Sequence, residues 1–226
     1  MAGYVVTGGT GELGRAVVRD LLARGDRVAV PYRNVAAWED LKAGSDTRNL
    51  WGETADIADV TATQRFFAEA FAWLGRLDGV AALAGGFRSS GRFETAPEEE
   101  WAAMLRINLA SAYATCRAAL PHLASAGGCI VTVVSRSAET GGSGMAAYAV
   151  SKMAVLALTR ALALEYRGRG VRVNAISPSI IDTAANRAAM PGADRAGWTP
   201  PERIAPVVGF LLSPSSAPVT GAVIPV

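Results

Sequence analysis

The 226-residue sequence contains very little histidine, cysteine or lysine. Its single histidine, His122, leaves too few imidazoles for most metal sites and for histidine-based triads, so we expect no metal. His122 follows Pro121 in an apolar helical pattern, which favours a structural role. Cys116 and Cys129 lack the spacing of a metal site and are expected to be buried, reduced thiols.

A strong excess of charge of one sign is also missing. The 22 basic and 20 acidic residues leave a net charge of +2, which does not favour nucleic acid or an anionic membrane as a partner. We find no secretory pattern near the first residues and expect no apolar run to span a bilayer. These absences predict a soluble cytoplasmic protein.

The composition is that of a globular domain. Hydrophobic residues make up 50% of the chain and charged residues 19%, which excludes extensive disorder. A chain of this length buries about 70% of its unfolded surface and needs no disulfide or metal for stability. We therefore expect one domain over residues 1–226.

Strand-like and helix-like segments alternate along the whole chain. Strands are expected at 4–7, 27–32, 50–54, 77–84, 129–135, 171–177 and 222–226. Helices are expected at 12–24, 35–43, 60–74, 97–123, 146–167 and 200–212. This alternation predicts an α/β fold: a doubly wound, Rossmann-like parallel sheet of about seven strands with helices on both faces. The looser stretch 182–201 is expected to form a substrate loop.

A glycine-rich turn, Thr7-Gly8-Gly9-Thr10-Gly11-Glu12-Leu13-Gly14, joins the first expected strand to the first helix. Glycines let the backbone approach a phosphate closely, and a helix N-terminus offers free N–H groups. The alternative is a tight turn that binds nothing. The position of this turn in the first strand–helix unit favours a dinucleotide.

Tyr148 and Lys152 stand four residues apart at the start of an expected helix, so both project from one face. A nearby ammonium lowers the pKa of a phenol from about 10, which permits acid–base chemistry on an alcohol or carbonyl. The alternative is a surface lysine beside a packed tyrosine. Ser135 ends the preceding strand, where it can hydrogen-bond the same carbonyl oxygen, with Ser137 as a competitor. Asn108 interrupts an apolar helix, where it either holds a water or a lysine or caps a kink.

Together these residues resemble the short-chain dehydrogenase/reductase family over nearly the whole chain. The glycine motif of the family is matched by Thr7-Gly8 and Gly14. Its catalytic tetrad is matched by Asn108, Ser135, Tyr148 and Lys152. The pair Asp56-Ile57 is similar to its adenine contact, and the segment 172–178 with Thr183 is similar to its nicotinamide contact.

Four positions depart from the family pattern. Glu12 replaces a glycine of the first motif, and Ser179 replaces the glycine after Pro178. Ala82-Leu83 replaces two asparagines that help to pin the strands around the cofactor. We therefore expect different local hydrogen bonding around the cofactor.

The resemblance implies hydride transfer between a nicotinamide cofactor and a carbonyl or secondary alcohol. Tyr148 is then the acid–base group, and Lys152 lowers its pKa and binds the nicotinamide ribose. Ser135 positions the substrate oxygen, and Asn108 supports a proton relay. The implied cofactor-binding residues are Gly8, Thr10, Gly11, Leu13, Gly14, Arg33, Asp56, Ile57, Ala84, Gly85, Lys152, Pro178, Ile181 and Thr183.

The end of the second strand bears on the cofactor. NAD-binding sites usually place an acid there, but this chain has Tyr32 followed by Arg33. Arg33 is suited to a 2′-phosphate, with help from Arg15, so we expect NADP(H) to be favoured over NAD(H). The alternative is a solvated arginine.

The expected helices at 101–120 and 146–164 are apolar on more than one face, which predicts a homodimer or homotetramer. Two other functions stay open. One is a non-catalytic dinucleotide-binding regulator of the same fold. The other is an epimerase or dehydratase of the extended relatives, although the small C-terminal region argues against a larger substrate domain.

Overall fold

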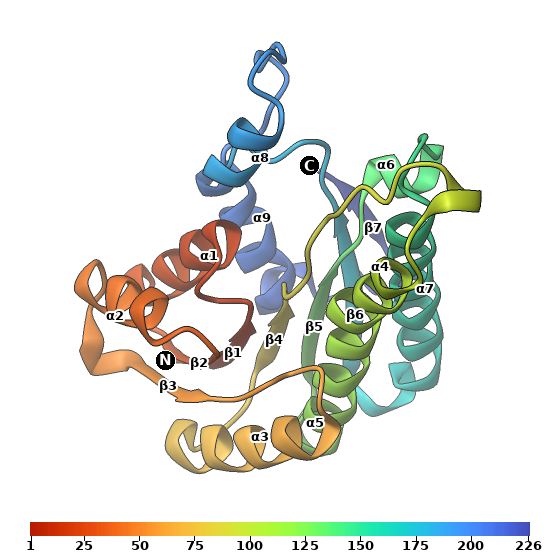
Figure 1. The fold of residues 1–226 in the computed structure, drawn as a ribbon. Coiled ribbons are helices and arrows are strands. Elements are labelled where there is room, and N and C mark those ends of the chain that lie inside the picture. Colours follow the sequence, from red (N-terminus) through yellow and green to blue (C-terminus); the bar gives the residue numbers. More distant parts are fainter.

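A seven-stranded sheet is the frame of the molecule. The computed structural model describes residues 1–226, and all strands are parallel in the order β3-β2-β1-β4-β5-β6-β7 (Figure 1). The strands are β1 Gly3–Thr7, β2 Arg27–Tyr32, β3 Leu50–Thr54, β4 Gly79–Ala82, β5 Gly128–Val133, β6 Val171–Ser177 and β7 Val223–Pro225. The order reverses between β1 and β4, so a ligand crevice is expected at the carboxyl ends of these strands.

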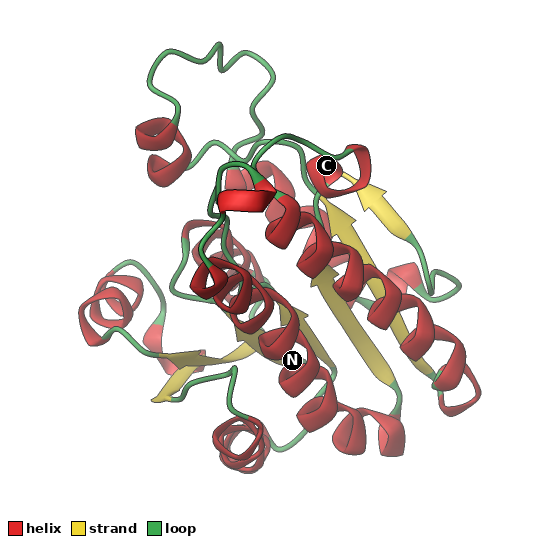
Figure 2. Ribbon diagram, turned by 45° about the vertical axis from the view of Figure 1, so that its right-hand side comes forward, coloured by secondary structure: helices red, strands yellow, loops and turns green.

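Helices cover both faces of the sheet. They are α1 Glu12–Ala23, α2 Val35–Ala43, α3 Val60–Leu74, α4 Glu98–Met104, α5 Ser111–Ala126, α6 Arg136–Thr140, α7 Ala146–Glu165, α8 Ala184–Ala189 and α9 Pro201–Leu212. The neighbouring residues Val5 and Val6 are both fully buried and belong to the cores of opposite faces. One core includes residues of α1, α2 and α9, and the other includes residues of α3, α5 and α7. Figure 2 shows the long helices lying against the sheet.

The predicted fold class is confirmed, and most predicted elements lie within a few residues of their observed bounds. The helical stretch predicted over 97–123 is confirmed, but it is not one regular α-helix. The chain instead forms α4, a π-helical turn at Leu105–Ala110, and α5. A π-turn takes an extra residue into the helix, and here it contains the buried Asn108. The short helices α6 and α8 were not predicted.

The prediction that no segment could span a bilayer also needs correction. Helix α7 is long and apolar enough to do so by length and composition. However, α7 packs on β6 and β5, and it carries the buried Lys152. We therefore interpret its sheet-facing side as that of a core helix, while 39% of the apolar window as a whole is buried.

The predicted loop 182–201 contains α8 and stands away from the rest of the molecule, next to α1 (Figure 1). Its base is closed by a bridge between Ile181 and Thr199, and Trp198 is buried beside it. None of the side chains of α8 is buried. The loop is thus attached through its base and through few other contacts.

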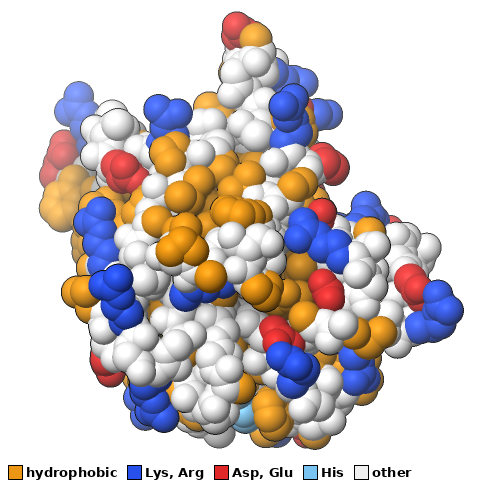
Figure 3. Space-filling model, turned by 180° about the vertical axis from the view of Figure 1, so that it is seen from behind, with side chains coloured by type: hydrophobic (Ala, Val, Ile, Leu, Met, Phe, Trp, Pro, Cys, Tyr) orange, Lys and Arg blue, Asp and Glu red, His pale blue; other side chains and the backbone are white.

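Basic and acidic side chains are interspersed over the face of the molecule seen in Figure 3, and hydrophobic side chains gather in its middle. No continuous basic patch is seen on this face. This distribution agrees with the small net charge of +2.

Candidate active site

The glycine turn after β1 forms a close-fitting cradle. A Cβ on Gly14 would lie 2.1 Å from the Gly8 carbonyl oxygen, so only glycine fits there. Gly11, the N-cap of α1, has no capping side chain, and the first backbone hydrogen bond of the helix is donated by Arg15. The N–H groups of the first turn therefore lack helical partners, as a phosphate site requires.

The Glu12 carboxylate reaches from the first turn of α1 to the start of α8. Its two carboxylate oxygens accept the N–H of Ala184 at distances of 2.9 and 3.0 Å. Arg15 does not pair with Glu12, because its guanidinium binds Asp40 of α2 and the Thr10 carbonyl oxygen. Arg15 is therefore already engaged and is a poor second ligand for a 2′-phosphate.

The remaining predicted cofactor residues lie at the same edge of the sheet. Arg33 follows β2 and is exposed without an ion pair, while Tyr32 stacks on Trp38 with ring centroids 5.0 Å apart. Asp56 follows β3 and pairs with Arg106 at 2.5 Å. The other predicted residues follow β3, β4 and β6, and they are Ile57, Ala84, Gly85, Pro178, Ile181 and Thr183.

Tyr148 lies in the first turn of α7, between the segments that follow β4 and β5. The ring of Phe87 meets its ring edge to face, with centroids 5.0 Å apart. Burial raises the pKa of the Tyr148 phenol, and a hydrogen bond with Ser135 acts in the opposite direction. The Ser135 hydroxyl is also 2.8 Å from that of Ser137, so the two predicted competitors form one hydrogen-bonded pair.

Lys152 is almost completely buried, with 6% of its surface exposed. Its amino group donates to the Val133 carbonyl at 3.1 Å, and burial lowers its pKa to about 8. The expected lowering of the Tyr148 pKa by Lys152 is not found, because burial dominates at Tyr148 and raises its pKa. Lys152 is a buried cation without a carboxylate partner, which is unusual outside functional sites.

Asn108 joins the π-turn to the segment after β4. Its amide oxygen accepts the Gly86 N–H at 3.0 Å, and its amide nitrogen donates to the Gly86 carbonyl and to the Ser151 hydroxyl, each at 3.0 Å. A Cβ on Gly85 would lie 2.6 Å from the Asn108 amide oxygen and 3.0 Å from the Lys152 amino nitrogen. Asn108, Lys152 and the end of β4 therefore meet at one point.

Two serines tie the loop before Tyr148 to the segment after β4. The Ser90 N–H donates to the Gly144 carbonyl at 2.9 Å, and the Ser89 hydroxyl donates to the same oxygen at 3.1 Å. This contact holds the segments of Phe87 and Tyr148 against each other. Sequence reasoning did not identify Ser151, because only the fold brings it to the site.

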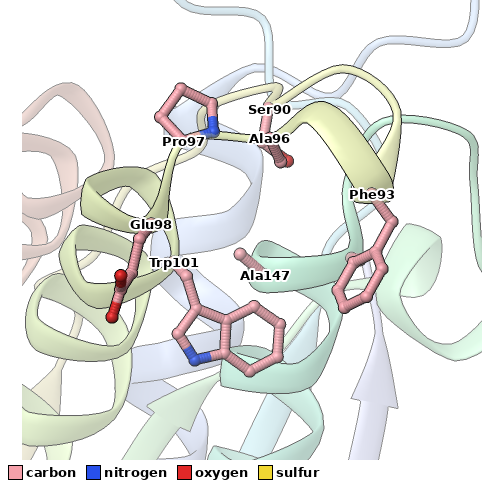
Figure 4. Close-up of a pocket in the computed structure, with 8 residues that line it drawn as sticks. Ser90, Phe93, Ala96, Pro97, Glu98, Trp101 and Ala147 are labelled. Carbon is pink, nitrogen blue, oxygen red and sulfur yellow. The ribbon is translucent and has the colours of Figure 1, made fainter.

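A separate hollow of about 180 Å³ lies outside this constellation (Figure 4). Phe93 and Trp101 flank it, and their ring centroids are 6.3 Å apart. Ala147 lies between them. None of the four tetrad side chains lines it. The hollow is therefore not the catalytic crevice.

The remaining singled-out residues lie elsewhere in the cores. Cys116 and Cys129 are free and buried, as expected, and burial raises their pKa values to about 12 and 11. His122 stacks on Phe71 with centroids 4.5 Å apart, and burial lowers its pKa. These contacts agree with structural roles.

Known proteins share both the sequence pattern and the fold. A family model described as enoyl-(acyl carrier protein) reductase matches residues 10–226. The chain is 30% identical to meso-2,3-butanediol dehydrogenase from Serratia marcescens, over 98% of this chain and 91% of that protein. It is 33% identical to 3-beta-hydroxysteroid dehydrogenase from Comamonas testosteroni, over 96% and 91%. The solved structure of NAD⁺-bound xylitol dehydrogenase superposes with a TM-score of 0.91 and 25% identity, over 100% of this chain and 97% of that one.

The family match covers nearly the whole chain, and the similar proteins are named dehydrogenases that act on alcohols or their carbonyl counterparts. The fold of the xylitol dehydrogenase is the one described above. The chain therefore belongs to the short-chain dehydrogenase/reductase family and is an NAD(P)-dependent oxidoreductase.

Proposed function

We propose that the protein transfers hydride between NADP(H) and a ketone or secondary alcohol, with Tyr148, Lys152, Ser135 and Asn108 as its catalytic tetrad. The observation that carries this proposal is the meeting of Asn108 and Lys152 at Gly85, where a single Cβ would touch both side chains. The Tyr148 phenol and the Ser135 hydroxyl interact one helical turn away, at the end of β5.

A dinucleotide fits the residues present at the crevice. The cradle at Gly8 and Gly14 would be filled by any Cβ, and the unpaired N–H groups of the first turn of α1 suit a pyrophosphate. The nicotinamide supplies or accepts the hydride when the cofactor is bound. Pro178, Ile181 and Thr183 are proposed to lie against its nicotinamide end, and Asp56 and Ile57 against its adenine.

The protein's own groups handle the proton. Tyr148 donates it to the substrate oxygen during reduction and removes it during oxidation. Ser135 donates a hydrogen bond to the same substrate oxygen. The buried amino group of Lys152 is proposed to bind the nicotinamide ribose. Asn108 holds the segment after β4 next to Lys152 through its hydrogen bonds to Gly86.

Replacement of Tyr148 by phenylalanine tests the proposal. We expect kcat to fall by about 100-fold or more, because a positioned acid–base group contributes at least this factor. The NADPH dissociation constant should stay near the wild-type value. NADPH absorbance is followed with a panel of ketones, and Tyr113→Phe, at an exposed tyrosine of α5, is the matched control. Near-normal turnover by Tyr148→Phe would refute the tetrad.

The preference for NADP(H) is supported by Arg33, which is exposed, without an ion pair, and next to Tyr32 at the end of β2. We expect Arg33→Ala to weaken NADPH binding by about tenfold and to leave NADH binding unchanged, because only NADPH carries the 2′-phosphate. Isothermal titration with both cofactors measures the difference. A wild-type preference for NADH would overturn this part of the proposal.

The substrate side of the site is supported by Phe87, whose half-exposed ring lies against Tyr148. An apolar wall beside the phenol favours a substrate with a hydrocarbon group next to its carbonyl. The similar proteins are named for butanediol, a hydroxysteroid and xylitol, so they indicate the alcohol class and do not narrow it further.

A homodimer or homotetramer is also proposed. Val150, Met153 and Leu164 are exposed along α7, and a groove of about 650 Å³ separates α7 from α5. A second copy would cover this apolar surface. The free, buried thiols of Cys116 and Cys129 are consistent with the proposed cytoplasmic localisation.

A non-catalytic regulator is the second candidate, because Glu12 places a carboxylate beside the proposed pyrophosphate site. Such a protein would bind NADPH and turn over none of the carbonyls in the panel. The buried, unpaired Lys152 argues against this reading, since a sensor does not need it.

A further inference from the structure

One hydrogen bond links the cofactor turn to the distant loop around α8. Glu12 is the first residue of α1, yet its carboxylate does not cap its own helix. Both oxygens accept the N–H of Ala184, which is 172 residues further along the chain. Figure 1 shows α8 beside the start of α1, in agreement with this contact.

Helix α8 has little else to hold it in place. Its six residues include no buried side chain. Apart from the bonds to Glu12, the hydrogen bonds of residues 183–197 stay within residues 181–198. The contact with Glu12 is therefore the only hydrogen-bonded link from residues 183–197 to a part of the protein outside residues 181–198.

The carboxylate completes the cap of α8. The Thr183 hydroxyl accepts the N–H of Asn186 at 3.2 Å, and the Glu12 carboxylate accepts the N–H of Ala184. Helices of this length are unstable alone, so an external partner for a first-turn N–H group orders the segment. A negative charge at a helix N-terminus is also favourable, and the nearby Arg187 is already paired with Asp182.

The same carboxylate is unfavourable for cofactor binding at the first turn of α1. It belongs to the first turn of α1, where the proposed cofactor pyrophosphate would bind, and two anions repel there. The glycine of the family pattern at this position has no carboxylate, so it neither binds the α8 segment nor repels the pyrophosphate. Glu12 thus acts on cofactor binding and on loop order in opposite directions.

We infer that Glu12 is a positioning residue that fastens the substrate loop to the cofactor turn, improving substrate binding while weakening dinucleotide binding. This inference rests on the proposed function for its substrate part only. The link itself is a property of the protein without substrate.

Glu12→Gln and Glu12→Ala separate the two effects. Glutamine keeps an oxygen that accepts the Ala184 N–H but removes the charge, whereas alanine removes both. Glu202→Ala, at an exposed first-turn glutamate of α9, is the control. The measurements are amide hydrogen exchange over residues 182–190, the NADPH dissociation constant, and the KM and kcat of the best carbonyl substrate.

Glu12→Gln should bind NADPH about fivefold more tightly than wild type, and Glu12→Ala should gain less, because it also frees Thr183, which is proposed to contact the nicotinamide. Exchange should accelerate about tenfold in Glu12→Ala and stay near wild type in Glu12→Gln. The KM should rise several-fold only in Glu12→Ala, with kcat little changed.

Wild-type exchange in Glu12→Ala, or equal acceleration in both variants, would overturn the tether. Unchanged NADPH affinity in both would overturn the charge effect. If the wild type reduces no carbonyl, the proposed function fails, and the exchange data still decide the tether.

Discussion

Substitution of Gly85 by alanine probes the point where the proposed catalytic side chains meet. The added Cβ would lie 2.6 Å from the Asn108 amide oxygen and 3.0 Å from the Lys152 amino nitrogen. Both distances are shorter than an ordinary contact, and both partners are buried, so one of them must move by about half an ångström or more. Gly85 does not have a positive φ, so backbone strain does not complicate the comparison.

The cost follows from the bonds that Asn108 would lose. Its amide makes three hydrogen bonds of 3.0 Å, two with Gly86 and one with Ser151. At about 1 kcal/mol for each weakened bond, we expect a loss of about 1–3 kcal/mol and a melting temperature lower by roughly 3–10 °C. Displacement of Lys152 by a fraction of an ångström should reduce kcat/KM by about 10- to 100-fold.

The neighbouring substitution Gly86→Ala is a matched control, because its Cβ would meet only the Ile107 side-chain end at 3.3 Å. Thermal melting and NADPH consumption are measured for Gly85→Ala, Gly86→Ala and wild type. If Gly85→Ala matches Gly86→Ala in both stability and turnover, Asn108 and Lys152 do not converge as described, and the proposed active-site geometry is refuted.

Three further changes test other parts of the structure. Thr7→Val should raise the free energy of unfolding by about 1 kcal/mol, because the buried Thr7 hydroxyl has no partner, whereas Thr132→Val should lower it by about as much, since that hydroxyl is bonded. Burial lowers the Lys152 pKa to about 8, so the cost of burying its charge is present below pH 8 and disappears toward pH 10.5. In urea titrations, the free energy of unfolding of wild type minus that of Lys152→Met should therefore rise by up to roughly 3 kcal/mol between pH 8 and pH 10.5. A difference that does not change with pH would contradict this prediction. Leu164→Arg should shift the sedimentation coefficient to that of a monomer, and an unchanged oligomer would exclude α7 from the interface.

The sequence predicted the fold because the fold depends on local patterns. Apolar runs between glycine turns predicted the strands, and the spacing of Tyr148 and Lys152 predicted a shared helix face. An interruption of the helix at Asn108 was predicted, but not the π-turn or the bond from Asn108 to Gly86, 22 residues away. The predicted lowering of the Tyr148 pKa was wrong, because burial raises this pKa. The spacing of residues in the sequence reveals the charged neighbour but not the burial of the phenol.

The asparagines missing at Ala82-Leu83 show how the fold tolerates a local loss. Thr7 pairs with Ala82 across β1 and β4, and its buried hydroxyl has no partner, so hydrogen bonding at this point is incomplete. The segment after β4 is nevertheless held from its other side, where Asn108 bonds both backbone groups of Gly86. The Asn108 bridge therefore holds the segment after β4, although the hydrogen bonding at Thr7 is incomplete.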